Sequence, residues 1–225
     1  MIDVRWGGED WVALGERALW WPRRRTLCVA DVHLGKAAAF RSAGVPVPES
    51  APADLARLAA LIGRWGAQRL VILGDLLHAR SGVTPAVIGA FADWRRTHGM
   101  LDVLLARGNH DVNAGEPPAE WRIRVLDGRC ADEGDGDVRF CHDPADVPEE
   151  AGPTLCGHLH PAVLLNGKSR AVRAACFWFG ERVAVLPAFG SFTGARVVRP
   201  ARGDRVLVVR DGEIAEAPCR EMSGA

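Results

Sequence analysis

The chain has 225 residues, of which 48% are hydrophobic and 25% are charged. This composition is typical of a folded globular protein and excludes a disordered chain, a coiled coil and a collagen-like polymer. The 28 Lys and Arg residues balance 28 Asp and Glu residues, so the formal net charge is zero and only a local basic patch could hold a polyanion such as nucleic acid.

The sequence also lacks the marks of export. No run approaches the roughly 20 apolar residues that span a bilayer, and acidic residues stand near the start, where a signal peptide would be basic and then apolar. Six cysteines form no Cys-x-x-Cys pair, and those at 28, 141 and 156 lie in apolar runs, as buried thiols do in a reducing compartment. We therefore expect a single domain, residues 1–225, in the cytoplasm and without membrane contact.

The first half of the chain alternates between strand and helix patterns. Apolar runs at residues 11–14 and 18–21 predict a hairpin, and the continuous apolar run at 27–30 predicts a strand covered on both faces. After a proline-rich loop at 45–52, the patterns fall at 54–65 (helix), 70–73 (strand), 85–96 (helix) and 103–106 (strand). This order predicts an α/β fold with βαβ units and a mainly parallel sheet.

The second half is different, because the helical period fades beyond Gly108. Short apolar stretches separated by Gly and Asp turns predict strands here. They lie at 121–126, 138–141, 154–156, 171–179, 183–186 and 205–209. This part of the chain is predicted to form a mixed sheet.

Side chains suited to metal binding follow five of these strands directly. Because ligands of open α/β sheets bind outside the carboxyl ends of the strands, we expect these side chains to meet at one edge. They are Asp31, His33, Asp75, Asn109, His142, His158 and His160. Any one of these motifs has an ordinary explanation as a helix cap or a turn, but five in succession after apolar strands do not.

The residue types indicate two ions rather than one. Imidazole suits zinc, copper, iron and nickel, whereas carboxylate and carbonyl oxygens suit manganese and magnesium. Three oxygen ligands and four imidazoles are too many for a single ion, but they suit two ions about 3.5–4 Å apart that share a bridging carboxylate. Glycines at 74, 108 and 157 would let the backbone turn sharply beside the ions.

The order of these motifs resembles the calcineurin-like metallophosphoesterases over roughly residues 27–190. The motifs are Asp31-x-His33, Gly74-Asp75, Gly108-Asn109-His110-Asp111, His142 and Gly157-His158-x-His160. The resemblance implies a four-layer α/β/β/α metallophosphoesterase sandwich with mixed sheets and a dinuclear metal centre. It also implies hydrolysis of phosphoester bonds.

The same resemblance implies a role for each motif residue. One ion is held by Asp31, His33 and His160, and the other by Asn109, His142 and His158, with Asp75 bridging the two. His110 resembles the family's catalytic histidine, which protonates the leaving oxygen or hydrogen-bonds a phosphoryl oxygen, and Asp111 its orienting carboxylate. The two roles of His110 stay open.

A narrower resemblance lies in residues 31–36, Phe40-Arg41, residues 74–78 and residues 186–194. These segments are similar to the small bacterial phosphoesterases associated with DNA ligase and repair genes. That similarity implies a manganese-dependent phosphodiesterase or DNA endonuclease, with a phosphodiester such as DNA as substrate and DNA-repair proteins as partners. Zn²⁺, Fe and Mg²⁺ are alternative metals.

Three further residues are candidates for substrate contact. Lys36 and Arg41 could hold a flanking phosphate of a diester, or lie on a solvated helix face. His78 could contact substrate, support a ligand, or be an ordinary hydrogen-bonded histidine of a loop. The alternative functions are a phosphatase or phosphodiesterase for small molecules such as nucleotides, a non-catalytic scaffold with this fold, and a dinuclear amide hydrolase, which the Gly-Asn-His-Asp motif disfavours.

Overall fold

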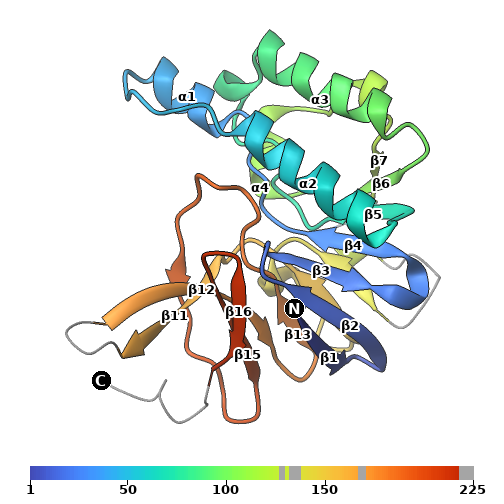
Figure 1. Ribbon diagram of the computed structural model, residues 1–225, viewed down its shortest axis with the longest axis vertical. Helices are drawn as coiled ribbons and strands as arrows, with labels where there is room; N and C mark the ends of the chain where they lie inside the picture. The colour runs from blue at the N-terminus through green and yellow to red at the C-terminus, as the bar shows by residue number, and fades with distance from the viewer. Residues whose placement is uncertain (127–129, 132–137, 167–170, 218–225) are drawn as a thin grey trace.

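The computed structural model describes residues 1–126, 130–131, 138–166 and 171–217 (Figure 1). Two sheets form its frame. The first has seven strands in the order of the chain, with antiparallel pairing from β1 to β4 and parallel pairing from β4 to β7. Its strands are β1 (Ile2–Trp6), β2 (Glu9–Leu14), β3 (Ala18–Trp21), β4 (Thr26–Val29), β5 (Arg69–Ile72), β6 (Asp102–Leu105) and β7 (Arg124–Val125).

The second sheet is mixed. Its strand order is β14-β11-β12-β13-β10-β9-β8, with β15 pairing to β12 and β16 to β15. The strands are β8 (Cys130–Ala131), β9 (Arg139–Cys141), β10 (Thr154–Cys156), β11 (Pro161–Asn166), β12 (Ala171–Phe179), β13 (Val183–Val185), β14 (Arg196–Val197), β15 (Arg205–Arg210) and β16 (Glu213–Glu216). In the described residues, β9, β10 and β13 run parallel to one another.

Every α-helix of the described residues precedes β7. The helices are α1 (Lys36–Ser42), α2 (Ala51–Trp65), α3 (Pro85–Thr97) and α4 (Asn109–Ala114), with short 3-10 turns η1 (Pro22–Arg24), η2 (Arg80–Gly82), η3 (Ala119–Trp121) and η4 (Pro144–Asp146). In Figure 1, α2 and α3 lie over the outer face of the first sheet, and the second sheet lies on its opposite side.

The alternation of side chains along the central strands builds two cores. In β4, Leu27 and Val29 pack with the apolar faces of α2 and α3. Cys28, between them, faces the other way and packs in the layer between the sheets, where Phe140 and Phe177 of the second sheet lie. Central strands buried on both faces explain the continuous apolar runs in the sequence.

The predicted α/β sandwich with mixed sheets is confirmed, and so are the hairpin, the parallel strands and both long helices. Its outermost layer is thinner than expected, because no α-helix of the described residues covers the far face of the second sheet. A smaller apolar cluster that includes Val163, Cys176 and Val206 lies on that face instead. The strand predicted at 121–126 is shorter, since η3 occupies its start.

Two other sequence expectations are tested by the fold. Cys28, Cys141 and Cys156 are fully buried as expected, and Cys28, Cys130, Cys156 and Cys176 are free thiols, while Cys219 lies outside the described residues. Among the helices described, none is both long and apolar enough to cross a membrane.

Candidate metal centre

The seven candidate ligands come together where β4, β5, β6, β9 and β10 end. Five of them have left-handed backbone, with φ between 45° and 67°: Asp31, His33, Asp75, His158 and His160. For residues with a side chain this conformation costs about 1–3 kcal/mol each and persists only where neighbouring contacts enforce it. Here the enforcing contacts run between strand ends, for example from the His33 N–H to the Asp75 carbonyl at 2.8 Å.

Glycine is required at two points of this edge for different reasons. Gly74 has φ of +80°, and a Cβ there would overlap the ring of His142. Gly108 has ordinary backbone with φ of −92°, but a Cβ there would lie 2.2 Å from the Asp75 carboxylate. The expectation of a sharp turn therefore holds at Gly74, whereas Gly108 is needed because the chain passes so close to Asp75.

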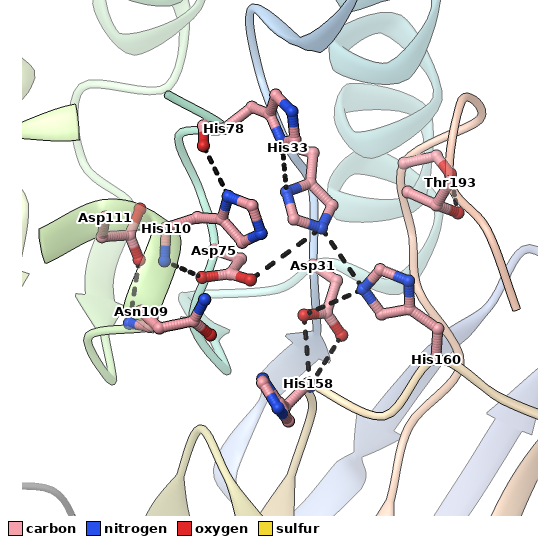
Figure 2. Close-up of polar contacts among 12 residues, drawn as sticks. Asp31, His33, Asp75, His78, Asn109, His110, Asp111, His158, His160 and Thr193 are labelled. Atoms are coloured by element: carbon pink, nitrogen blue, oxygen red, sulfur yellow. Dashed lines mark hydrogen bonds and ion pairs between the residues drawn. The ribbon is translucent and has the colours of Figure 1, made fainter. Parts of the chain in front are cut away.

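One group of candidate ligands consists of Asp31, His33 and His160, whose donor atoms lie within 4.8 Å of one another. The His160 Nε2 is 3.4 Å from an Asp31 oxygen and 3.2 Å from the His33 Nε2 (Figure 2). Asp31 is fully buried, and its carboxylate accepts the His158 backbone N–H at 3.0–3.1 Å. This matches the first predicted ligand set.

The second group consists of Asp75, His142 and His158, again within 4.8 Å. The His142 Nε2 lies 3.1 Å from the His158 Nδ1 and 3.1 Å from the Asn109 side-chain oxygen. Asn109 is exposed and begins α4. The structure thus brings together the second predicted ligand set as well.

Asp75 lies between the two groups. Its Oδ2 is 3.9 Å from the His33 Nε2 and 3.5 Å from the His142 Nε2, while its Oδ1 accepts the His110 backbone N–H at 2.9 Å. Burial raises the pKa of Asp75, and the nearby Asp31 carboxylate raises it further. Two carboxylates in so dry a place require positive charge beside them.

The histidines are arranged as metal ligands are. The Nδ1 of His142 lies 2.9 Å from the Leu73 carbonyl, and the Nδ1 of His160 lies 3.1 Å from the Gly194 carbonyl. A carbonyl only accepts, so each Nδ1 carries a proton, and in the neutral imidazole each Nε2 presents a lone pair to the centre. Burial, together with the Lys36 ammonium, lowers the pKa of His33 to about 2, which keeps this imidazole neutral. The donor set therefore fits divalent metal ions.

His110 lies beside this centre. Its Nδ1 is 2.6 Å from the His78 carbonyl, and its ring stacks on the His78 ring at 4.7 Å (Figure 2). The expectation that Asp111 orients this ring is wrong, because Asp111 binds backbone groups instead. The two Asp111 oxygens accept the backbone N–H groups of Leu77 and Gly108 at 2.8 and 3.0 Å, so Asp111 fixes the start of α4 and the His78 carbonyl holds the imidazole.

His78 contacts two residues of the site. Besides holding His110 through its carbonyl, its Nδ1 lies 3.4 Å from the His33 Nδ1. Burial and the Lys36 ammonium lower the pKa of His78 to about 4. The donor atoms of His33, His78 and His110 also lie within 4.8 Å of one another. Among the roles expected for His78, the structure favours support of the neighbouring residues His33 and His110 over substrate contact.

Lys36 and Arg41 differ, although they lie on the same short helix. Lys36 is half-buried; burial lowers its pKa, while the carboxylates of Asp31 and Asp75 raise it. The Lys36 ammonium is therefore close enough to interact electrostatically with both carboxylates. The Arg41 guanidinium instead pairs with Glu49 at 2.5 Å and donates to the Val47 carbonyl at 3.0 Å, which favours a structural role.

Two positioning residues on α2 were not predicted from the sequence. The buried Asp54 carboxylate accepts the Ser191 backbone N–H at 3.1–3.2 Å. Arg57 donates to the Phe189 carbonyl, and its guanidinium lies 4.1 Å from the centroid of the Phe189 ring. These contacts anchor the loop whose Gly194 carbonyl orients His160. The signal in the sequence was that Asp54 shares the apolar face of α2 with Leu58 and Ile62.

The strained backbone leads to a prediction for His160, whose φ is 45°. His160→Gly and His160→Ala both remove the ligand, but glycine adopts this conformation without a steric penalty. We expect the glycine variant to be more stable than the alanine variant by about 1 kcal/mol. Thermal unfolding of the two metal-free variants measures the difference. Equal stability, or a more stable alanine variant, would contradict the strained conformation.

The fold and this centre define a metallophosphoesterase. Among solved structures, the chain is similar to the nuclease MPE of Pseudomonas putida, with 40% sequence identity and a TM-score of 0.81, covering 96% of this chain and 99% of that chain. The chain therefore belongs to the small bacterial metallophosphoesterases, and it is a metal-dependent phosphoesterase.

Two more distant structures also match. The phosphoesterase Yfce from E. coli has 16% identity and a TM-score of 0.39, covering 88% of this chain and 94% of its own. A conserved uncharacterized protein from Streptococcus pneumoniae TIGR4 has 12% identity and a TM-score of 0.31, covering 87% and 90%. No protein-family model matches the chain, and no curated protein matches it either.

Proposed function

We propose that the chain is a dinuclear phosphodiesterase that uses Mn²⁺ to hydrolyse nucleic acid during DNA repair in the cytoplasm. The observation that carries the dinuclear proposal is the place of Asp75, whose Oδ2 faces one histidine of each ligand group. Asp31, His33 and His160 would hold one ion, and Asn109, His142 and His158 the other, with Asp75 on both. When bound, two such ions polarise phosphoryl oxygens and lower the pKa of a water molecule.

His110 is proposed to act on the substrate. The His78 carbonyl accepts from its Nδ1 whether the ring is neutral or charged, so Nε2 keeps its direction while a proton moves. From there Nε2–H can donate to the leaving oxygen or to a phosphoryl oxygen. Asp75 accepts the backbone N–H of the same residue, so the ligand and the proposed catalyst are held together.

Nucleic acid is the favoured substrate on two grounds. The similar protein from P. putida is described as a nuclease. In addition, a cleft of about 770 Å³ opens beside Asn109, His142 and His158, which leaves room for more than the reacting phosphate. Its charged lining is mixed, with Arg107, Asp143 and Asp146. The alternative substrate is a small phosphoester. A scaffold role is disfavoured, because all seven candidate ligands meet.

The substrate proposal is tested by assays with Mn²⁺ on bis-p-nitrophenyl phosphate, p-nitrophenyl phosphate, single-stranded DNA and duplex DNA. We expect hydrolysis of the diester and of DNA, and little of the monoester. A preference for the monoester without cleavage of DNA would instead establish the small-molecule alternative. An Asp31→Ala variant serves as the inactive control, because it lacks a candidate ligand whose carboxylate also holds the His158 backbone N–H.

The position of Lys36 leads to a further prediction. Because its ammonium interacts with Asp31 and Asp75, we expect Lys36→Ala to lower kcat/KM for bis-p-nitrophenyl phosphate and for DNA by similar factors. The salt dependence of DNA binding should also fall by about one counterion. Arg41→Ala is the matched control, and both activities should stay within about twofold of the parent, as for a surface ion pair. A loss confined to DNA would place Lys36 at a flanking phosphate.

A further inference from the structure

The exposed aromatic rings of this chain are gathered in one place. The chain has seven Phe, eight Trp and no Tyr, and all of these lie within the described residues. Only Phe40 and Phe192 among them are exposed, at 36% and 37%. Their ring centroids are 5.4 Å apart in an edge-to-face arrangement. Two solvent-exposed phenyl rings that contact each other suggest a surface kept for a ligand.

This aromatic pair borders the metal centre. The Phe40 ring lies 6.4 Å from the His78 ring, which in turn stacks on His110 at 4.7 Å. Phe192 belongs to the loop between Gly190, whose N–H donates to the Asp31 carbonyl at 3.1 Å, and Gly194. In Figure 2 the next residue of that loop, Thr193, lies on the His160 side of the centre.

Both rings are held by ordered backbone. The loop of Phe192 is anchored on α2 by Asp54 and Arg57. Phe40 lies on α1 four residues after Lys36, and residues so spaced share one face of a helix. This face therefore presents a cation near the metal-binding carboxylates and, about one turn or 5.4 Å farther along, an aromatic ring. Phosphate and base follow each other in a nucleotide at a comparable spacing.

We propose that Phe40 and Phe192 form an aromatic subsite that stacks the nucleobase next to the phosphate being cleaved. The proposal rests on the proposed nucleic-acid substrate and names the residues that contact its base. Every base has a π face, so stacking on phenyl rings binds nucleic acid without regard to sequence. An aliphatic phosphoester offers nothing to occupy these rings.

The test uses substrates that differ only in the base. Thymidine 5′-(p-nitrophenyl phosphate) is compared with its abasic analogue, in which hydrogen replaces thymine, and the 3′ esters are compared in the same way. The ratio of kcat/KM with and without the base measures base recognition. In Phe40→Leu and Phe192→Leu we expect this ratio to fall by about tenfold for at least one of the two ester series, within the range known for base stacking on aromatic side chains.

Phe40→Trp should keep the ratio, since it keeps an aromatic ring. Leu164→Ala, at an exposed apolar residue of β11, should leave the ratio unchanged. The same ratio in the parent and in both leucine variants, with all esters hydrolysed, would overturn the subsite. If the parent hydrolysed none of the esters with any divalent metal, the proposed function would be wrong, and the subsite, which rests on it, would be wrong too.

Discussion

Asp75→Asn is expected to abolish hydrolysis and to lower the metal content of the protein. The Asp75 Oδ1 already accepts the His110 backbone N–H. An asparagine that keeps this hydrogen bond must turn its NH₂ group toward His33 and His142, and an amide nitrogen is not a ligand for divalent ions. Among the described residues, no other candidate ligand has a side-chain atom that faces a histidine of each group, so the loss of bound metal should exceed that of any other single ligand variant.

The measurement pairs elemental analysis of bound metal with the rate on bis-p-nitrophenyl phosphate. Asp111→Asn is an instructive control, because this second buried carboxylate holds backbone N–H groups and is expected to affect stability more than metal content. Two ions bound to Asp75→Asn together with parental activity would show that Asp75 does not bridge.

His110→Ala is expected to keep both ions while its rate falls by about 10²–10⁴-fold, the usual contribution of general acid catalysis. The reason is that the His110 ring is held by the His78 carbonyl and is proposed to act on the substrate. If the residue protonates the leaving oxygen, the loss should be smaller for bis-p-nitrophenyl phosphate than for DNA, because p-nitrophenolate leaves without a proton.

Metal analysis of the same variant separates catalyst from ligand. His110 shares a possible metal-binding group with His33 and His78, so loss of an ion from His110→Ala would assign it to the ligands. Equal losses on both diesters, with the ions retained, would favour a hydrogen bond to a phosphoryl oxygen over protonation of the leaving group.

The gathering of the candidate ligands could be predicted from the sequence because each of them follows a buried apolar strand. Within each sheet, parallel strands bring such positions to one edge. Because β4, β5 and β6 lie in the first sheet and β9 and β10 in the second, the two halves of the centre meet through the packing of the sheets, which the sequence did not predict. The long helices α2 and α3 were predictable for a related reason, since their apolar faces repeat over several turns. Local pattern and global fold agree in these parts of the chain.

The remaining contacts depend on backbone groups and on tertiary packing. The carbonyls of Leu73, His78 and Gly194, which orient three histidines, leave no mark on the sequence. For that reason the family pattern suggested Asp111 as the partner of His110, whereas the structure shows a carbonyl in that place. Likewise, Glu49 pairs with Arg41 across a loop whose path the sequence did not predict.

Some strands were missed although a signal existed. β11 contains a run of apolar residues directly after the Gly-His-x-His motif, which is a strand signal that the predicted elements did not include. β1 and β16 are different, because charged residues alternate along β1 and stand at both ends of β16. Pairing with β2 and β15 stabilises these two strands more than their own hydrophobicity does. Their sequences are therefore weak signals for strands.

A centre for two metal ions is tested best by counting the ions bound per chain. The metal-free protein is titrated with Mn²⁺ at equilibrium, and bound metal is counted alongside activity on bis-p-nitrophenyl phosphate. We expect two ions per chain, with hydrolysis appearing as the second site fills, and a single ion in His158→Ala. Full hydrolysis by the metal-free protein, or with only one ion bound, would show that the reaction does not need a centre of two ions.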